Sequence, residues 1–280
     1  SAGKNKIQEL LLRPGPGVPS GRAEAKRPPV PTGRENLPPE HLATAQSSFS
    51  PALLRGLAQQ LDLDLTPQQC DRLVVYVNLL QRWNQVHNLT AIGSAGALTH
   101  HLLDCLAIVR PLERALSRYA NALSAPASGA PVHFLDAGAG AGLPGIPLAI
   151  AQPHWHGTLV DAVQKKCAFL QQARIELHLR NITVHHARLE SSGLPPHDLI
   201  VSRAFASLRD FVVCTQALLR PQGLWAAMKG RSPVEELADL PEGVEAVETV
   251  TLRVPRLREQ RHLVILRQRA DAQPRSAAPN

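Results

Sequence analysis

The stretch from Phe134 to Leu148 constrains the fold of this chain more than any other part of the sequence. An apolar run at 132–135 predicts a short buried strand that ends at Asp136. Glycines follow at positions 138, 140 and 142, and the apolar stretch after them predicts a helix. Glycines at this spacing let the backbone turn sharply and expose its N–H groups, and the helix directs its positive end toward them. We therefore expect a loop that binds a nucleotide-type ligand.

Strands and helices alternate from this loop onward, which is typical of a doubly wound parallel sheet. The strands are expected at 132–135, 157–160, 182–185, 198–201 and 224–228, with helices ending near 151 and covering 165–179 and 208–219. Two extended segments in a row, at 247–254 and 262–266, indicate an antiparallel pair. The predicted fold class is α/β: a Rossmann-like, mostly parallel sheet with an antiparallel C-terminal strand pair, preceded by a small N-terminal helical cap.

Differences in composition divide the rest of the chain into four segments around the α/β domain. Residues 1–48 are rich in proline and carry more basic than acidic side chains, so we expect a disordered basic tail. Residues 49–116 show helical periodicity and form the predicted cap, and 117–131, rich in Ala, Ser and Pro, is predicted to be a connector. The α/β domain is expected at 132–268, followed by a disordered tail at 269–280.

Three helices are expected in the cap, at 51–61, from Pro67 to Trp83, and at 100–109. The second begins with Thr66-Pro67-Gln68-Gln69, which supplies an N-cap, a proline at the first helical position and a glutamine three residues after the cap. Asp104 is expected to cap a helix or form a pair within this cap.

Two acids narrow the ligand. In doubly wound sheets ligands lie beyond the carboxyl ends of the strands, and Asp161 follows the next strand at the spacing of about 20 residues where a carboxylate can bind ribose hydroxyls. Both NAD-type and S-adenosylmethionine-type sites satisfy that spacing. A dinucleotide fingerprint has Gly-x-Gly-x-x-Gly, whereas Gly138, Gly140 and Gly142 alternate here. Asp136 also suits an ammonium group better than a pyrophosphate, so S-adenosyl-L-methionine is favoured.

Charge and cysteine usage indicate the partner and the compartment. The formal net charge is +7 with a pI near 9.7, which favours an anionic partner, nucleic acid first, over a role in solubility alone. The four cysteines lie far apart without a Cys-x-x-Cys, which argues against a metal site or a disulfide framework and fits a reducing cytoplasm. No apolar run has the length of a membrane span, and no secretory h-region follows the start, so we expect a cytoplasmic protein.

From about Ser50 to Arg267 the chain resembles the bacterial 16S ribosomal RNA guanine-N7 methyltransferase family, RsmG, also called GidB. The resemblance rests on motifs that occur in order over more than 200 residues. They are Trp83-Asn84…Asn88-Leu89-Thr90, His101-Leu102-Leu103-Asp104, Asp136 to Leu148, Leu159-Val160-Asp161, Lys165-Lys166, Phe169-Leu170, Asn181-Ile182, Ser202-Arg203-Ala204-Phe205-Ala206, Lys229-Gly230 and Arg261-His262-Leu263-Val264.

This resemblance implies a methyltransferase sheet at 132–268 that transfers a methyl group from S-adenosylmethionine to N7 of guanine 527 in 16S rRNA of the small ribosomal subunit. Carried over residue by residue, it implies cofactor contacts at Gly138, Leu143, Leu189, Glu190 and Arg203. Position and chemistry add Asp136 and Gly140 in the loop, and Asp161 on the ribose.

Methylation of guanine N7 requires no general base, because N7 is a lone-pair nucleophile without a proton. Alignment and desolvation are sufficient. We hypothesise that Arg203 is the catalytic residue and clamps the methionine carboxylate, an RNA phosphate or guanine O6. The candidates for RNA phosphate contacts are Lys165, Lys166, Arg188, Lys229, Arg231 and Arg261.

Three other functions remain as alternatives: a methyltransferase of another RNA, an NAD-dependent oxidoreductase, and a methyltransferase-like RNA-binding protein without activity. The glycine spacing disfavours the second, and the intact loop together with Asp161 disfavours the third. We expect a monomer without a bound metal.

Overall fold

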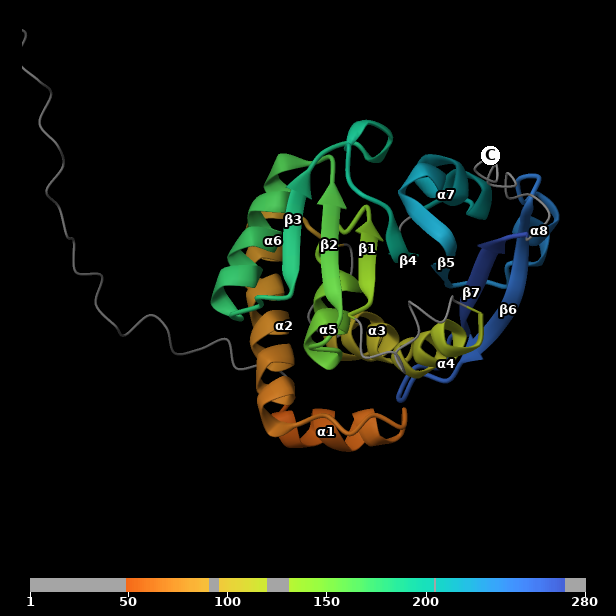
Figure 1. Cartoon of the computed structure of the whole chain (residues 1–280). Coiled ribbons are helices and arrows are strands. Elements are labelled where there is room, and N and C mark those ends of the chain that lie inside the picture. Colours follow the sequence, from red (N-terminus) through yellow and green to blue (C-terminus); the bar gives the residue numbers. More distant parts are fainter. Residues whose placement is uncertain (1–48, 91–95, 120–130, 204, 270–280) are drawn as a thin grey trace, which may run out of the picture. The chain divides into compact units, whose positions relative to one another are not determined.

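The computed structural model describes residues 49–90, 96–119, 131–203 and 205–269. In these residues a seven-stranded sheet forms the centre of the fold (Figure 1). The strand order is β3-β2-β1-β4-β5-β7-β6. The strands are β1 (His133–Ala137), β2 (His156–Asp161), β3 (Ile182–His186), β4 (His197–Ser202), β5 (Leu219–Lys229), β6 (Val244–Leu252) and β7 (Arg261–Gln268). β1 to β5 pair in parallel, and β7 pairs antiparallel with both β5 and β6. The predicted sheet and its antiparallel C-terminal pair are confirmed.

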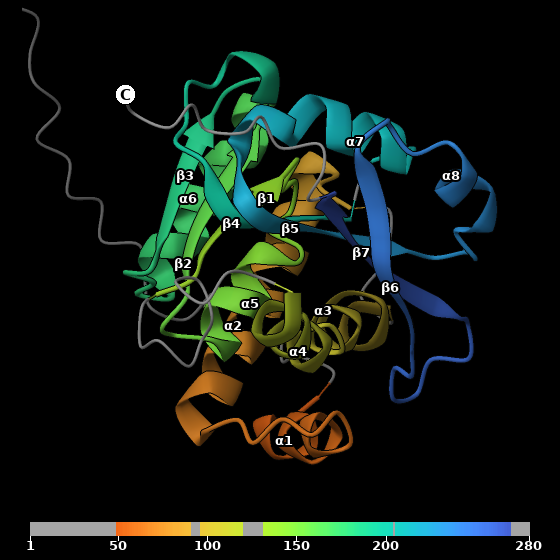
Figure 2. The same cartoon turned by 45° about the vertical axis from the view of Figure 1, so that its right-hand side comes forward.

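Hydrophobic clusters cover both faces of the sheet because successive strand residues point to opposite sides. Phe134 belongs to the cluster on one face and Leu135 to the cluster on the other. Helices of the first face are α1 (Pro51–Gln59), α2 (Pro67–His87), α3 (Asp104–Leu106), α4 (Val109–Tyr119), α5 (Gly145–Ala151) and α6 (Gln164–Glu176). α7 (Leu208–Thr215) and α8 (Val234–Ala238) pack on the opposite face, and the two views agree on this arrangement (Figures 1 and 2). The sheet therefore lies between two helical layers.

The start of α2 follows the sequence signals. The Thr66 hydroxyl accepts from the Gln69 N–H at 3.2 Å, and the Gln69 side chain accepts from the Thr66 N–H at 2.9 Å. This capping box satisfies donors that the first turn of a helix leaves free. The helix runs beyond the predicted Trp83 and ends at His87, where Asn88 adopts a left-handed conformation.

The predicted helix at 100–109 is wrong in its boundaries. A π-helical segment, η3 (Ala97–Leu103), passes into α3, and α4 begins at Val109 and continues to Tyr119, inside the predicted connector. The reason is that Leu112, Ala115 and Leu116 extend a buried stripe at helical spacing. The rest of that connector, 120–130, lies outside the described residues.

The helices from 51 to 119 share their core with the sheet. The Tyr76 hydroxyl in α2 donates to the carbonyl of Ala141 at 2.7 Å, and the Gln69 amide donates to the carbonyl of Ile150 at 2.8 Å. Both contacts join α2 to the segment that follows β1. The predicted boundaries of cap and domain stay predictions, and the two predicted tails, 1–48 and most of 269–280, lie outside the described residues.

Candidate functional site

The glycine loop between β1 and α5 adopts a conformation that suits glycine. Gly138, Gly140 and Gly142 have φ values of 70°, 57° and 83°, in the left-handed region where side chains are strained. A side-chain carbon at Gly142 would lie 2.5 Å from Cδ1 of Ile146, so the Ile146 side chain would have to move to admit one. At Gly138 it would meet no atom within 4 Å, so the loop has open space on that side. The predicted sharp turn is confirmed, and Gly138 is the point at which a ligand can approach the backbone.

Asp136 at the end of β1 is fully buried. Its Oδ2 accepts from the N–H of Gly145 at 2.8 Å, whereas its Oδ1 is buried without a hydrogen-bond partner. The loss of hydration on burial raises the pKa of Asp136 to about 7, although the Gly145 hydrogen bond opposes this. The Asp136 carboxyl is therefore only partly ionised at neutral pH, and a nearby cation would favour its ionised form.

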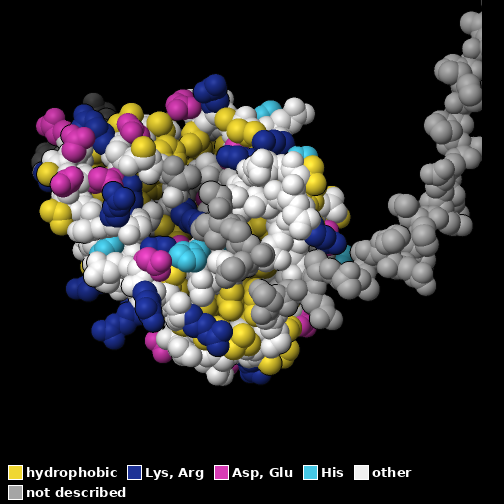
Figure 3. Space-filling model, turned by 180° about the vertical axis from the view of Figure 1, so that it is seen from behind, with side chains coloured by type: hydrophobic (Ala, Val, Ile, Leu, Met, Phe, Trp, Pro, Cys, Tyr) yellow, Lys and Arg dark blue, Asp and Glu magenta, His cyan; other side chains and the backbone are white. Residues whose placement is uncertain are grey.

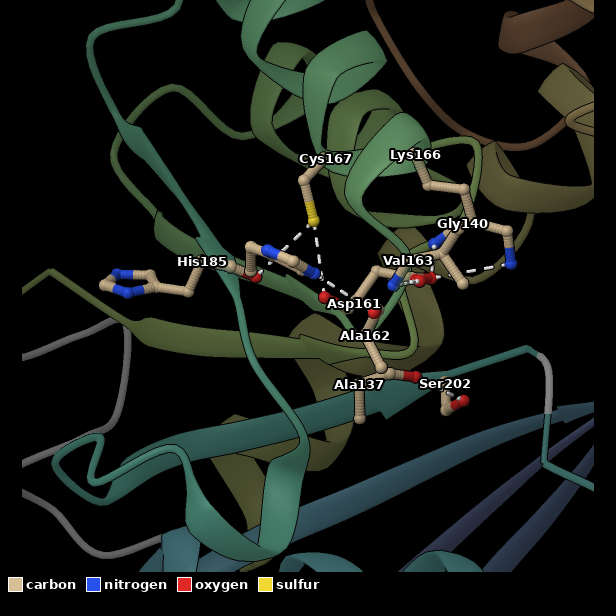
Figure 4. Close-up of polar contacts among 10 residues, drawn as sticks. Ala137, Gly140, Asp161, Ala162, Val163, Lys166, Cys167, His185 and Ser202 are labelled. Atoms are coloured by element: carbon tan, nitrogen blue, oxygen red, sulfur yellow. Dashed lines mark hydrogen bonds and ion pairs between the residues drawn. The ribbon is translucent and has the colours of Figure 1, made fainter. Parts of the chain in front are cut away.

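Asp161 at the end of β2 binds the glycine loop directly (Figure 4). Its Oδ2 accepts from the N–H of Gly140 at 2.9 Å, and its Oδ1 accepts from the N–H of Val163 at 2.8 Å. Nζ of Lys166 lies 3.7 Å from Oδ2. A carboxylate offers about four acceptor positions, so Asp161 holds the loop and retains lone pairs for ligand hydroxyls. The spacing of the two segments predicts the ribose contact but not this second contact with the loop.

The carboxyl ends of β1 and β4 are also joined. The Ser202 hydroxyl donates to the carbonyl of Ala137 at 2.9 Å, as Figure 4 shows. Arg203 follows directly and leaves the sheet toward the helical layer. Its Nη1 donates to the carbonyl of His100 at 3.2 Å, and its Nη2 lies 3.3 Å from Nδ1 of His101. The half-buried guanidinium is thus positioned by a segment 103 residues earlier in the chain.

A cavity of about 230 Å³ adjoins Arg203. It is lined by His100, Asp104, Arg203, Met228, Lys229, Gly230, Arg261 and His262. Sheet register explains part of this set, since Lys229 at the end of β5 pairs with His262 at the start of β7. The cavity brings together three predicted residues, Arg203, Lys229 and Arg261, from three different strand ends.

Two of these cations are paired within the protein. Lys229 lies 2.7 Å from Glu236, and Nε of Arg261 lies 3.6 Å from Oδ1 of Asp104. Asp104 is expected from the sequence to cap or pair inside the helical segment, but this ion pair reaches β7. The sequence alone does not assign Asp104 or His262 to a site. Their signals are present, because both belong to motifs already singled out, but nothing in the sequence joins those motifs.

The remaining predicted residues lie around the same edge of the sheet. Leu189 and Glu190 form a short 3₁₀ turn, η5 (Leu189–Ser191), after β3, with Leu189 partly buried and Glu190 exposed. Hydrogen bonds, the first from its own backbone N–H, lower the pKa of Glu190. Leu143 is buried at the end of the glycine loop. Lys165, Arg188 and Arg231 are exposed.

Basic side chains are not confined to one patch on the face seen in Figure 3, where acidic side chains lie among them. The net charge alone therefore does not locate a binding surface. In the described ranges, no group of three His, Cys, Asp or Glu side chains could hold a metal ion. Within the same residues, no helix is long and apolar enough to cross a bilayer.

Known proteins match this chain over most of its length. The sequence model of a family described as "GidB: rRNA small subunit methyltransferase G" matches residues 69–264. A protein of Ralstonia nicotianae named ribosomal RNA small subunit methyltransferase G is 48% identical over 217 residues, which cover 76% of this chain and 93% of that protein. Proteins of the same name from Methylibium petroleiphilum and Paracidovorax citrulli are 46% and 44% identical, covering 76% and 79% of this chain and 93% and 91% of theirs.

Proposed function

Because the chain belongs to the GidB family of small-subunit rRNA methyltransferases, we propose that it transfers a methyl group from S-adenosylmethionine to N7 of guanine 527 in 16S rRNA. The main structural support for this function is that two features lie at the same edge of the sheet. One is the glycine loop with its two acids, and the other is the cavity beside Arg203.

The residues of the loop fit S-adenosylmethionine. Gly138 leaves the backbone open to a ligand, and the unpartnered Oδ1 of Asp136 is a buried acceptor that an ammonium group would satisfy. Asp161 would hold the ribose hydroxyls with the lone pairs that its backbone contacts leave free. Gly138 and Leu143 would lie beneath the methionine part, with Gly140 in the same loop, and Leu189 and Glu190 would flank the adenine.

When bound, S-adenosylmethionine supplies an electrophilic methyl group on a sulfonium. The protein itself must align the guanine, exclude water and balance charge, because N7 has no proton to remove. Arg203 suits this role because its contacts to His100 and His101 fix the guanidinium. Those contacts leave other N–H donors for a carboxylate, a phosphate or guanine O6.

RNA would approach over the same edge. Exposed Lys165 and Arg188, together with the paired Lys166, Lys229 and Arg261, would contact phosphates on the way to the cavity. The small ribosomal subunit is the proposed partner, the cytoplasm the proposed location and a monomer the proposed state.

The test is to incubate the protein with methyl-labelled S-adenosylmethionine and small subunits from a strain that lacks the modification. Label should enter 16S RNA, and the protein should bind S-adenosylhomocysteine but not NADH. Label only in another RNA would overturn the substrate, and preference for NADH would overturn the enzyme class.

Arg203→Ala should lower the rate of methyl transfer by roughly a hundredfold or more, since positioning losses of this size are common in aligned sites. Arg209→Ala is a matched control, because Arg209 is an exposed arginine on α7 that contacts Asp239. Near-normal transfer by the Arg203 variant would remove this residue from the site.

A further inference from the structure

Two buried polar atoms without a hydrogen-bond partner belong to residues that line the cavity beside Arg203. They are Oδ1 of Asp104, which forms an ion pair with Nε of Arg261 at 3.6 Å but accepts no hydrogen bond, and Nε2 of His262. The Asp104 side chain is only 6% exposed. Buried polar atoms that make no hydrogen bond are uncommon in proteins, and each demands an explanation. A ligand that carries both hydrogen-bond donors and an acceptor would satisfy both atoms.

The charges around Asp104 limit the kind of ligand. Burial raises the pKa of Asp104, whereas Arg203, Arg261 and His100 act in the opposite direction. The guanidinium groups of Arg203 and Arg261 favour the carboxylate against this effect of burial, and a carboxylate only accepts hydrogen bonds. A phosphate beside Asp104 would be repelled by this carboxylate. Asp104 therefore suits a neutral ligand group that carries N–H donors.

The opposite partner is His262 at the start of β7. Its Nδ1 lies 3.5 Å from the hydroxyl of Thr251. When that hydroxyl donates to Nδ1, the ring can carry its proton on Nε2, which is then a donor buried in the cavity wall. The lining thus offers acceptors from Asp104 and a donor from His262.

Guanine has the matching edge. Its N1–H and N2–H₂ are adjacent donors, and its O6 is an acceptor beside them, whereas adenine has an acceptor at N1 and no 2-amino group. Contacts on this edge leave N7, on the other ring, free for methylation. The cavity of about 230 Å³ is smaller than the roughly 300–1,000 Å³ of pockets for drug-sized ligands, and it suits a single base turned out of its stack.

We propose that Asp104 selects guanine, its carboxylate accepting hydrogen bonds from N1–H and N2–H₂ of the target base while Nε2–H of His262 donates to O6. The proposal rests on the function proposed above and adds the residue that reads the base. Met228 provides the soft apolar wall on which the base packs.

The test compares two substrates that differ in one amino group. Small subunits are reconstituted with 16S RNA carrying either guanine or inosine, which lacks the 2-amino group, at the target position. The wild type should methylate guanine in preference to inosine by roughly tenfold or more, because inosine loses one hydrogen bond to a charged acceptor. Asp104→Asn keeps the size of the side chain and should reduce this ratio several-fold.

A second variant separates base reading from charge balance. Asp104→Glu retains the charge that faces Arg203 and Arg261 but displaces the carboxylate, so it should also lose the guanine preference. If Asp104 only balances those cations, Glu restores the wild-type ratio and the proposal fails. Asp64→Asn is the control, because Asp64 is an exposed acid between α1 and α2, and its ratio should equal that of the wild type.

Measuring the binding of the guanine and inosine RNAs separates the role proposed for Asp104 from the proposed methyltransferase function. Methyl transfer with a guanine-to-inosine ratio that Asp104→Asn and Asp104→Glu leave unchanged would overturn the role of Asp104 and retain the function. Absence of methyl transfer, with tighter binding of the guanine RNA that depends on Asp104, would retain base recognition and overturn the function. Thermal unfolding and binding of S-adenosylhomocysteine, both unchanged, would show that each variant is folded.

Discussion

The protonation of Asp136 should control cofactor affinity. The pKa of this carboxyl is about 7 because burial penalises its charged form. A ligand ammonium beside it favours the charged form, so binding requires ionisation. Below about pH 7 the ionised fraction falls tenfold for each pH unit, and the affinity should fall with it.

The magnitude follows from that pKa. Between pH 8 and pH 6 the dissociation constant of S-adenosylhomocysteine, which carries the same ammonium, should rise about tenfold, or about 1.4 kcal/mol of binding free energy. Binding near pH 6 should also release a proton. The sign is fixed: a carboxyl with a raised pKa binds a cation better as pH rises.

Isothermal titration calorimetry at pH 6, 7 and 8, in buffers of different ionisation enthalpy, measures both effects. Asp136→Asn is the control, because the amide oxygen can still accept from the Gly145 N–H but the residue cannot titrate. The variant should bind more weakly than the wild type at pH 8 and show little change toward pH 6. A wild-type affinity that is as flat with pH as that of the variant would refute the reasoning.

Two further predictions concern the loop itself. Gly142→Ala should lower the free energy of unfolding by roughly 2–5 kcal/mol, because residue 142 has a positive φ and its side chain would meet Ile146. Gly56→Ala, at an open position in α1, is the control and should be neutral or stabilising by up to about 1 kcal/mol. Chemical denaturation measures both variants, and equal effects would contradict the packing argument. Tyr76→Phe should cost about 1–3 kcal/mol because the Ala141 carbonyl loses its donor, and a melting temperature equal to that of the wild type would show that this bond contributes little.

Local signals made much of the fold predictable. The alternation of apolar runs located the parallel strands, and the Thr66 to Gln69 pattern located the start of α2, because each depends on neighbouring residues only. The alternate glycines predicted the turn for the same reason. Helix ends were harder: α4 extends through Ala- and Ser-containing sequence because residues such as Leu112 and Leu116 pack on the core.

The cavity was not predictable from spacing. Its lining comes from the helical segment and from the ends of three strands, and only the sheet order places them together. The contact of Arg203 with His100 and the ion pair of Asp104 with Arg261 join motifs that a single sequence presents as unrelated. Residue type and position predict Arg203, Lys229 and Arg261, whereas only the fold places the acid, Asp104, between them.

The site of methylation tests the central claim most directly. Reduction followed by aniline treatment cleaves RNA at N7-methylguanine, and primer extension locates the break. In small subunits from a strain that lacks the modification, incubation with the protein and S-adenosylmethionine should produce a new break at guanine 527, which Arg203→Ala abolishes. A methyl group incorporated into 16S RNA without a break at guanine 527 would contradict the account.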